Sequence, residues 1–257
     1  METLCSVKNL TFSYNSTKKV LDNISFDIHK NEIVGILGKN GSGKTTLLNL
    51  ITGFLNNYSG EISLYRQNIK DFSLANRAKV IAYIQQSKIT IPEYYNVEEF
   101  VLEGRRPFRK LGFYNKEDYE ILDTIITQCN LDSFRNRQVK SLSGGELQRC
   151  VFAKALMKQC DFFIFDEPTS AMDIKYQKDF FELASVAKQN LNAGILLSIH
   201  DINLAVKYCD RLIVLDSGSI LFDDYSKRIT TDILKKAFDT DFSETCTEEK
   251  YFFISTI

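Results

Sequence analysis

The residues with the clearest capacity for chemistry run from Gly38 to Thr45, in the order Gly-Lys-Asn-Gly-Ser-Gly-Lys-Thr. The stretch follows a short apolar run at 33–37 and precedes a second one at 47–51 that favours a helix. Strand, glycine-rich turn and helix form the setting in which Gly-x-x-x-x-Gly-Lys-Thr binds phosphate. Glycines permit positive φ, so backbone N–H groups can turn inward and form an anion cradle with the helix N-terminus.

Different parts of this phosphate loop are expected to contact different parts of a nucleotide. The Lys44 ammonium would reach the β- and γ-phosphates, and the Thr45 hydroxyl would ligate Mg²⁺. Further phosphate contacts are expected from the rest of the loop and the start of its helix: Gly38, Asn40, Gly41, Ser42, Gly43 and Thr46. The alternative is a glycine turn with a surface lysine, and the flanking strand and helix argue against it.

A second stretch able to bind an anion is Leu142-Ser143-Gly144-Gly145-Glu146, which begins a helix expected to reach about Lys158. The first turn of a helix exposes unpaired backbone N–H groups, and a serine hydroxyl adds a further donor here. A plain helix N-cap would account for Ser143. It would not account for two glycines at a helix start, where each costs helix stability. We therefore expect Ser143, Gly144 and Gly145 to contact phosphate.

Two adjacent carboxylates, Asp166 and Glu167, follow the apolar run 162–165. That run has the composition of a fully buried parallel strand, and ligands of open α/β sheets lie at the carboxyl ends of such strands. We expect Asp166 to hold Mg²⁺ in its outer shell and Glu167 to polarise the water that attacks the γ-phosphate. Two solvated acids closing a strand are the alternative.

Three single residues are weaker candidates. His200 follows the buried run 194–199 and could hydrogen-bond a γ-phosphate, although a lone histidine is more often a structural polar residue. It follows a strand as Glu167 does, so both could project from the same sheet edge. Tyr14 lies in a polar turn and could stack on a base or simply end a strand at the rim of the core. Gln86 follows a β-branched run, and by itself favours a solvated loop.

Hydrophobic periodicity predicts the elements that must position these residues. Strands are expected at 4–7, 10–12, 20–21, 24–28, 33–37, 61–64, 80–84, 161–167 and 194–199, with a hairpin at 211–216 and 219–222 and a last strand at 251–254. Helices are expected at 97–102, 117–128, 143–158, 174–191 and 228–239. The basic, aromatic stretch 105–114 is either a docking surface or a solvated loop.

Composition limits the classes of function. The chain has 257 residues, 44% of them hydrophobic, which suits one large globular domain or one domain with a lobe inserted in it. Lys and Arg number 32 against 33 Asp and Glu, so the net charge of −1 gives no electrostatic reason to expect nucleic acid as a partner. No apolar run has the length of a membrane span, and Met1-Glu2-Thr3-Leu4 does not resemble a signal peptide.

Six cysteines and two histidines do not match the spacing of a zinc site. Buried reduced thiols, in a reducing compartment, are the expected interpretation.

Taken together, the motifs resemble those of the ATP-binding cassette (ABC) ATPase family, in the family's order and over nearly the whole chain. In that resemblance Tyr14 is the aromatic that stacks on adenine, and Gln86 is the Q-loop residue, which the resemblance places at the catalytic site and the metal. The other motifs are the Walker A loop at Gly38–Thr45, the signature at Leu142–Glu146, the Walker B strand at Phe162–Glu167, the D-loop at Ser170–Asp173 and the switch histidine, His200. Gln85 stands where the family commonly has proline, and Met172 where leucine is commoner; neither removes a contacting group.

The resemblance implies an α/β fold: a P-loop NTPase sheet core with an N-terminal antiparallel β subdomain and an inserted α-helical subdomain. One ABC ATPase domain would fill residues 1–257. Its parts would be a nucleotide-binding core at 1–90 and 159–222, an inserted helical subdomain with the signature at 91–158, and a C-terminal extension at 223–257.

The resemblance also implies a mechanism and partners. Two such subunits would pack head to tail as a homodimer, with ATP and Mg²⁺ between the Walker A loop of one and the signature of the other. Hydrolysis would drive separate transmembrane permease subunits, with an extracytoplasmic substrate-binding protein and no nucleic acid. The subunit would lie at the cytoplasmic face of the membrane. The stretch 95–108 and the short tail after residue 223 resemble ATPases of iron–siderophore, haem and cobalamin importers.

Four alternatives remain open to different degrees. The chain could drive an exporter or another class of importer. A soluble ABC protein acting on ribosomes or DNA commonly has two cassettes or a long inserted arm. This chain has one cassette and no excess of basic residues, which argues against that alternative. A GTPase would need an Asn-Lys-x-Asp string, which is absent. A non-catalytic cassette is disfavoured because Lys44, Asp166, Glu167 and His200 are all present.

Overall fold

Strand β3 (Ile33–Leu37), which leads into the phosphate loop, is buried along its whole length. The predicted continuous apolar run is typical of a strand inside a parallel sheet. Strands β8 (Gly194–Ser198) and β9 (Arg211–Asp216) pair with β3 in parallel on its two sides. Strand β10 (Ser219–Tyr225) pairs antiparallel with β9 through the predicted hairpin, which gives the order β10-β9-β3-β8.

The structure is a computed structural model that describes residues 2–15, 18–85, 94–109, 113–169, 173–247 and 250–256. It divides into two compact units, the first formed by Met1–Phe72 with Gly194–Ile257 and the second by Ser73–Ala193. The domain boundaries expected from the sequence stay a prediction.

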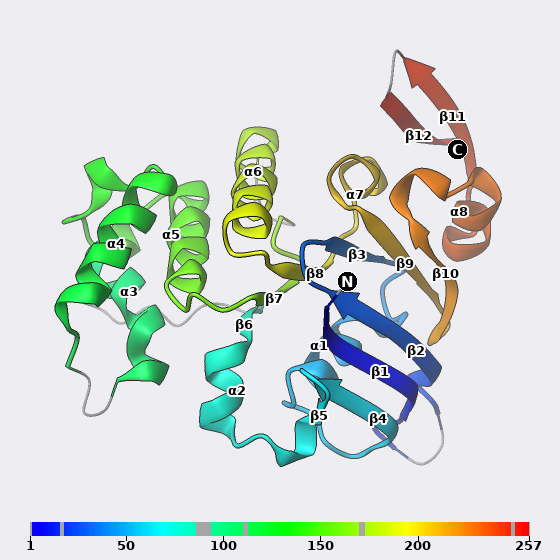
Figure 1. The fold of residues 1–257 in the computed structure, drawn as a ribbon. Helices are drawn as coiled ribbons and strands as arrows, with labels where there is room; N and C mark the ends of the chain where they lie inside the picture. The colour runs from blue at the N-terminus through cyan, green and yellow to red at the C-terminus, as the bar shows by residue number, and fades with distance from the viewer. Residues whose placement is uncertain are drawn as a thin grey trace. The chain divides into compact units, whose positions relative to one another are not determined.

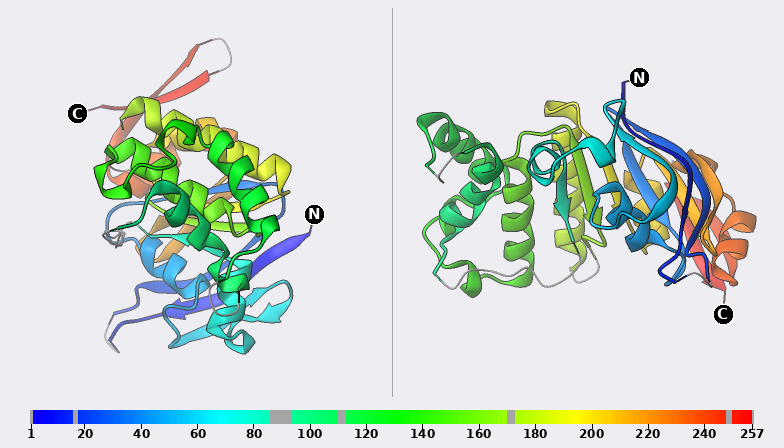
Figure 2. Two further views of the ribbon diagram at one scale, coloured as in Figure 1. Left: turned by 90° about the vertical axis from the view of Figure 1, so that its left-hand side faces the viewer. Right: turned by 90° about the horizontal axis from the view of Figure 1, so that it is seen from below.

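The first unit also contains the N-terminal antiparallel sheet, whose long strands run side by side in Figure 2. Its order is β2-β1-β4-β5, with bounds Leu21–His29, Thr3–Phe12, Tyr58–Leu64 and Gln67–Asn68. The prediction of two separate strands at 4–7 and 10–12 was wrong, because one continuous strand, β1, covers both. Asn9 takes a φ of 49° and the register with β2 shifts between Val7 and Leu10, so the polar break is a bulge and not a strand end.

Helices and a second hairpin complete the first unit (Figure 1). They are α1 (Lys44–Ile51), the 3₁₀ turns η1 (Ile69–Asp71) and η5 (Ser226–Arg228), α7 (Ile202–Tyr208), α8 (Thr231–Phe238), β11 (Asp241–Thr247) and β12 (Lys250–Thr256). Helix α7 and strand β11 were not predicted. The helix has only seven residues, and the polar sequence of β11 lacks the alternation that reveals a strand.

The second unit is mainly helical, with α3, α4 and α5 grouped together in Figure 1. Its elements are α2 (Leu74–Val80), β6 (Ala82–Ile84), α3 (Val97–Leu102), η2 (Glu103–Phe108), α4 (Lys116–Gln128), η3 (Asp132–Phe134), η4 (Val139–Ser141), α5 (Gly144–Leu156), β7 (Phe162–Asp166) and α6 (Ile174–Asn190). The strand expected from Val80 begins only at Ala82, because Val80 ends α2. That helix buries none of its residues and therefore shows no apolar stripe in the sequence.

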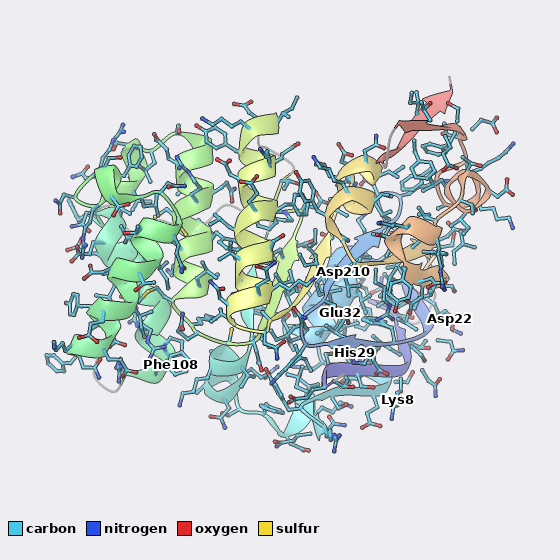
Figure 3. All side chains as sticks on the ribbon, turned by 45° about the horizontal axis from the view of Figure 1, so that its top comes forward. Lys8, Asp22, His29, Glu32, Phe108 and Asp210 are labelled. Carbon is cyan, nitrogen blue, oxygen red and sulfur yellow. The ribbon has the colours of Figure 1, made fainter. Side chains whose placement is uncertain are left out.

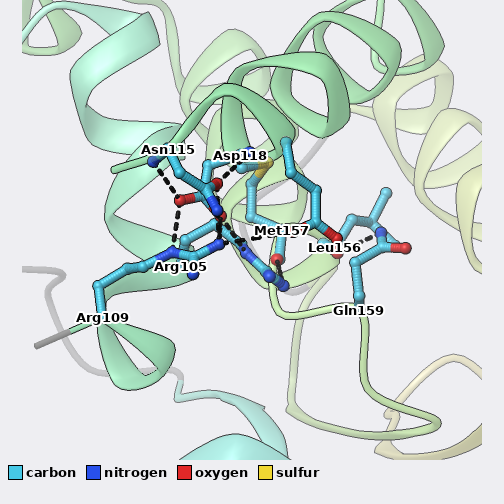
Figure 4. A network of polar contacts seen from close by, with 8 residues as sticks. Arg105, Arg109, Asn115, Asp118, Leu156, Met157 and Gln159 are labelled. Atoms are coloured by element: carbon cyan, nitrogen blue, oxygen red, sulfur yellow. Dashed lines mark hydrogen bonds and ion pairs between the residues drawn. The ribbon is translucent and has the colours of Figure 1, made fainter. Parts of the chain in front are cut away.

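A buried ion pair network connects η2 with α4 and explains part of the basic stretch 105–114 (Figure 4). Arg105 Nε and Arg109 Nη2 donate to Asp118 Oδ1 at 2.8 and 2.7 Å, and Arg105 Nη1 also reaches the Met157 carbonyl at 3.3 Å. Burial alone would raise the pKa of Asp118, but hydrogen bonds from Arg109, Asn115 and Arg105 hold it at about 2. These two arginines are structural, so neither a solvated loop nor a docking surface describes them.

Among the described residues, no helix combines the length and the apolar character that crossing a bilayer requires. Within the described part of the chain, five thiols are free and buried, as expected: Cys5, Cys129, Cys150, Cys160 and Cys209.

Candidate nucleotide site

The phosphate loop joins β3 to α1 in the way that its glycines predict. Gly43 has a φ of 106° and lies directly before the helix, and a Cβ there would come 2.6 Å from the Leu21 side chain. At Gly38, with a φ of 152°, a Cβ would lie 2.4 Å from the Leu215 carbonyl oxygen. Both positions therefore require glycine, for conformation and for space.

The Lys44 side chain is buried and turned into the loop. Its ammonium donates to the carbonyl oxygens of Gly38 at 2.8 Å and of Lys39 at 3.1 Å. A buried ammonium is costly unless such acceptors compensate for lost hydration. The same geometry places the charge inside the concave side of the loop, where a phosphate would approach the backbone amides at the start of α1.

The two threonines that follow have different surroundings. Thr45 is exposed, whereas Thr46 is buried and its hydroxyl lies 3.1 Å from the Tyr14 hydroxyl. The Tyr14 ring packs edge-on against Phe12, with centroids 4.9 Å apart, and remains largely exposed. An exposed ring held beside the start of α1 is suitably placed to stack on a base, which supports the expectation without testing it.

His200 lies at the same end of the sheet as the phosphate loop. Ile36 and Ser198 are partners in the parallel register of β3 and β8, and the Ile199 amide donates to the Ile36 carbonyl at 3.1 Å. Two residues beyond that register pair, one strand continues into Gly38 and the other into His200, which is exposed. Asp201 then caps α7 by accepting a hydrogen bond from the Leu204 amide at 2.9 Å.

Two carboxylates that sequence reasoning did not single out fix the opposite end of β3 (Figure 3). Asp210 Oδ2 accepts a hydrogen bond from the Ile33 amide at 2.7 Å, and Glu32 Oε1 accepts one from the His29 amide at 2.6 Å. Burial raises the pKa of Glu32, against the opposing effect of this hydrogen bond and of Arg211. Both carboxylates position the strand and stand apart from its phosphate end.

In the second unit, Asp166 ends β7 and is almost completely buried. Strand β6 runs parallel to β7, with Ile84 opposite Phe165, so Gln85 and the two carboxylates lie at the carboxyl ends of neighbouring strands. The phenol of Tyr83 on β6 lies near Asp166: burial, and then the charge of that carboxylate, raise the pKa of Tyr83. The sequence held no pattern that would have paired these two residues.

Glu167 has a left-handed backbone, with a φ of 49°. That conformation costs a non-glycine residue about 1 kcal/mol. Strained backbone of this kind gathers at functional sites, where the surrounding structure holds a side chain in a required direction. The side chain is partly buried at the end of a fully buried strand. This placement agrees with a carboxylate that must face a ligand, which remains a prediction.

Ser143 caps α5 through a reciprocal pair of hydrogen bonds with Glu146. Its hydroxyl accepts from the Glu146 amide at 3.4 Å, and its amide donates to Glu146 Oε2 at 2.7 Å. The backbone hydrogen bond with Ser143 lowers the pKa of Glu146. A hydroxyl that accepts at its oxygen still has its hydrogen to donate, so the capping role expected as an alternative is compatible with phosphate binding.

The two signature glycines have different roles. Gly145 is buried, and a Cβ at this position would lie 2.4 Å from Cδ2 of the Tyr176 ring on α6. At Gly144 a Cβ would meet nothing within 4 Å. Gly145 therefore allows α5 and α6 to pack closely, and Gly144 leaves the first turn of α5 open to a ligand. Tyr176 lies 31 positions further along the chain, and no local sequence pattern predicts a contact over that distance.

Alanine substitutions should separate these roles. Gly145→Ala is expected to lower stability by about 1–3 kcal/mol, because the new methyl group overpacks against Tyr176. Gly144→Ala is the matched control and should be neutral or stabilising, since alanine favours a helix and neither glycine has a positive φ. Thermal unfolding of both variants measures the difference, and equal melting temperatures would contradict it.

Each unit thus carries part of the predicted site. The first unit holds the phosphate loop from Gly38 to Thr46, with Tyr14 beside its helix and His200 at the same sheet end. The second holds Asp166 at the end of β7, Glu167 directly after it, and the signature at the start of α5. Gln86 and the D-loop residues 170–172 lie outside the described residues.

The residues predicted to hold Mg²⁺ have suitable chemistry. Thr45 and Asp166 offer hydroxyl and carboxylate oxygens, the hard donors that this ion requires. Among the described residues, no group of three or more His, Cys, Asp or Glu side chains could hold a metal by itself. Mg²⁺ usually takes one or two protein oxygens together with phosphate and water, so this donor set fits it.

Comparison with known proteins gives a consistent result. Residues 21–170 match the family described as ABC transporter. The chain is 34% identical to the petrobactin import ATP-binding protein FpuC of Bacillus anthracis, over 86% of this chain and 81% of that one. It is 32% identical to the phosphonates import ATP-binding protein PhnC of Fusobacterium nucleatum, over 93% and 100%.

A solved structure extends the likeness to the fold. A chain of a metal-chelate type ABC transporter, in an inward-facing conformation, superposes with a TM-score of 0.85 and 26% identity, covering 100% of this chain and 98% of that one. The expected P-loop NTPase core, with an antiparallel β subdomain and a helical subdomain, is confirmed as the fold class. The chain therefore belongs to the ABC transporter family, as an ATP-binding subunit that hydrolyses ATP.

Proposed function

We propose that this chain powers the import of a metal chelate, such as an iron–siderophore complex, haem or cobalamin. The observation that carries the proposal is the likeness, over the whole chain, to a chain of a metal-chelate type transporter. The resemblance of residues 95–108 to the corresponding segment of such importers supports the same assignment.

In this proposal the described residues divide the chemistry of ATP hydrolysis. Lys44 exchanges the loop carbonyls for the β- and γ-phosphates, and Tyr14 stacks on the adenine. Glu167 accepts a proton from the attacking water, while His200 and Gln86 contact the γ-phosphate and the water. Thr45, Asp166 and Gln86 would hold Mg²⁺. When bound, this ion would neutralise negative charge on the phosphates.

A homodimer explains why one chain carries two separate anion sites. The phosphate loop lies in the first unit and the open N-terminus of α5, with Ser143 and Gly144, in the second. Packed head to tail, two copies would place the signature of each against the γ-phosphate bound by the other. ATP would then hold the dimer together, and hydrolysis would release it.

A cavity of about 370 Å³ in the second unit is the proposed contact with the permease. Gln85, directly before the Q-loop residue Gln86, lines it together with Phe100, Lys154 and Lys158. The Lys154 ammonium lies 4.3 Å from the Phe100 ring centroid, and burial lowers the pKa of both lysines. Permease binding there would place the subunit at the cytoplasmic face of the membrane. An extracytoplasmic binding protein would deliver the chelate.

The cargo is the part of the proposal that most needs a test, because one relative imports phosphonates. The tagged chain is purified from detergent-solubilised membranes of its own cells with whatever permease accompanies it, and the complex is returned to liposomes. A polytopic permease should co-purify, and a ferric siderophore, haem or cobalamin should stimulate ATP hydrolysis. The same complex carrying Glu167→Gln provides the control without hydrolysis.

Two results would contradict this assignment. Stimulation by a phosphonate and by no metal chelate would make the chain the motor of another importer. Purification with ribosomal or DNA-repair proteins, and with no membrane protein, would remove the transport function while leaving the ATP chemistry intact.

A further inference from the structure

The phosphate loop has a contact that the family motifs do not describe. Its second residue, Lys39, forms an ion pair with Asp239, which lies 200 positions later, directly after α8. The Lys39 side chain is 36% exposed and that of Asp239 is 82% exposed. Exposed ion pairs contribute little to folding stability. A gain in stability therefore does not by itself account for an ion pair between Lys39 and Asp239.

Lys39 is also part of the hydrogen bonding inside the loop. Its carbonyl oxygen accepts from the Lys44 ammonium at 3.1 Å and from the Ser42 amide at 3.1 Å. The backbone of Lys39 therefore belongs to the loop that is proposed to bind the phosphates. Asp239 pairs with the side-chain ammonium of the same residue.

Asp239 itself is held in a defined place by both flanking segments. Its φ of 52° ends α8, and its amide donates to the Lys235 carbonyl at 2.9 Å. Further along the chain, two hydrogen bonds join β12 to α7. The Asn203 side chain on α7 accepts from the Phe253 amide on β12 at 2.8 Å and donates to the Phe253 carbonyl at 3.2 Å. Helix α7 is the one that follows His200. Figure 1 shows α8 and the β11–β12 hairpin near the C-terminus, with α7 next to α8.

We propose that Asp239 weakens nucleotide binding by occupying the ammonium of Lys39. It neutralises and restrains Lys39, and the phosphates of a bound nucleotide compete with it for the Lys39 ammonium. By linkage, nucleotide in the loop weakens the hold of the C-terminal segment (residues 231–256) on the loop, and loss of that hold strengthens nucleotide binding. The inference rests on the proposed role of the phosphate loop as the nucleotide site.

A double-mutant cycle with Mg²⁺ and ADP tests this link, with Kd measured by calorimetry on the full chain. Asp239→Asn frees Lys39 and should tighten ADP binding about twofold to fivefold, the range of an exposed ion pair. In the background of Lys39→Gln the same change should give no gain, because no ammonium remains to be released. Measurement at about 0.15 M salt screens distant charges, which separates the contact from general repulsion.

The matched control is Asp241→Asn, which breaks an ion pair with Lys235 in the same segment. Neither residue of that pair belongs to the loop or to the ion pair that Lys39 forms, so ADP affinity should stay at the wild-type value. The proposal is overturned if Asp239→Asn leaves the Kd unchanged, or if it gives an equal gain with and without Lys39. Failure of the wild-type chain to bind ADP would instead overturn the phosphate-loop assignment, and this inference with it.

Discussion

The Glu167→Gln chain is expected to bind ATP and to accumulate as an ATP-bound dimer, while kcat for hydrolysis falls about 10²- to 10⁴-fold. An amide has the shape of the carboxylate but cannot accept the proton of the attacking water. Glutamine meets the left-handed backbone, with its φ of 49°, at about the same cost as glutamate. Phosphate release measures kcat, and size-exclusion chromatography with Mg²⁺ and ATP measures the dimer.

Glu182→Gln is the matched control for this prediction. Glu182 lies on α6 in the same unit, in an exposed ion pair with Lys178 at 3.4 Å, and its change removes the same charge. Its kcat should equal that of the wild type. If Glu167→Gln hydrolyses ATP at the wild-type rate, Glu167 is not the base, and its strained backbone needs another explanation.

The elements that could be predicted from sequence are those whose residues are buried in a periodic pattern. Strand β3 is a continuous apolar run, and α4 repeats its apolar residues at the helical period, so both were expected close to their observed bounds. Helix α2 and strand β11 were missed because neither shows a buried face in its sequence. Hydrophobic periodicity arises only where one face of an element is buried, so exposed elements cannot be predicted from it.

The candidate site divides in a similar way. Gly38 to Thr45 and the pair Asp166 and Glu167 could be proposed from the sequence because phosphate binding demands particular residue types at fixed local spacing. The contact of Gly145 with Tyr176 and that of Lys39 with Asp239 were missed. Each joins residues distant in the chain, and such pairs leave no local pattern to recognise.

Substitution of Ser143 by arginine should prevent formation of the ATP dimer without preventing a single chain from binding nucleotide. The long cationic side chain would fill the space that Gly144 leaves open before the first turn of α5. The serine hydroxyl would no longer be available to donate to a γ-phosphate. The phosphate loop belongs to the other unit and is not altered. In the background of Glu167→Gln, light scattering with Mg²⁺ and ATP should report only monomer.

Loss of the helix cap must be separated from this effect, because Ser143→Arg also removes an N-cap worth about 1 kcal/mol. Ser73→Arg is the control for that loss. Ser73 is exposed and caps α2 in the same unit, where its hydroxyl accepts from the Asn76 amide at 3.2 Å. Both variants should lose similar stability, but only Ser143→Arg should lose the dimer. A dimer that persists in Ser143→Arg would show that the signature does not complete the site of a second copy, and the two anion sites of one chain would then have to act independently.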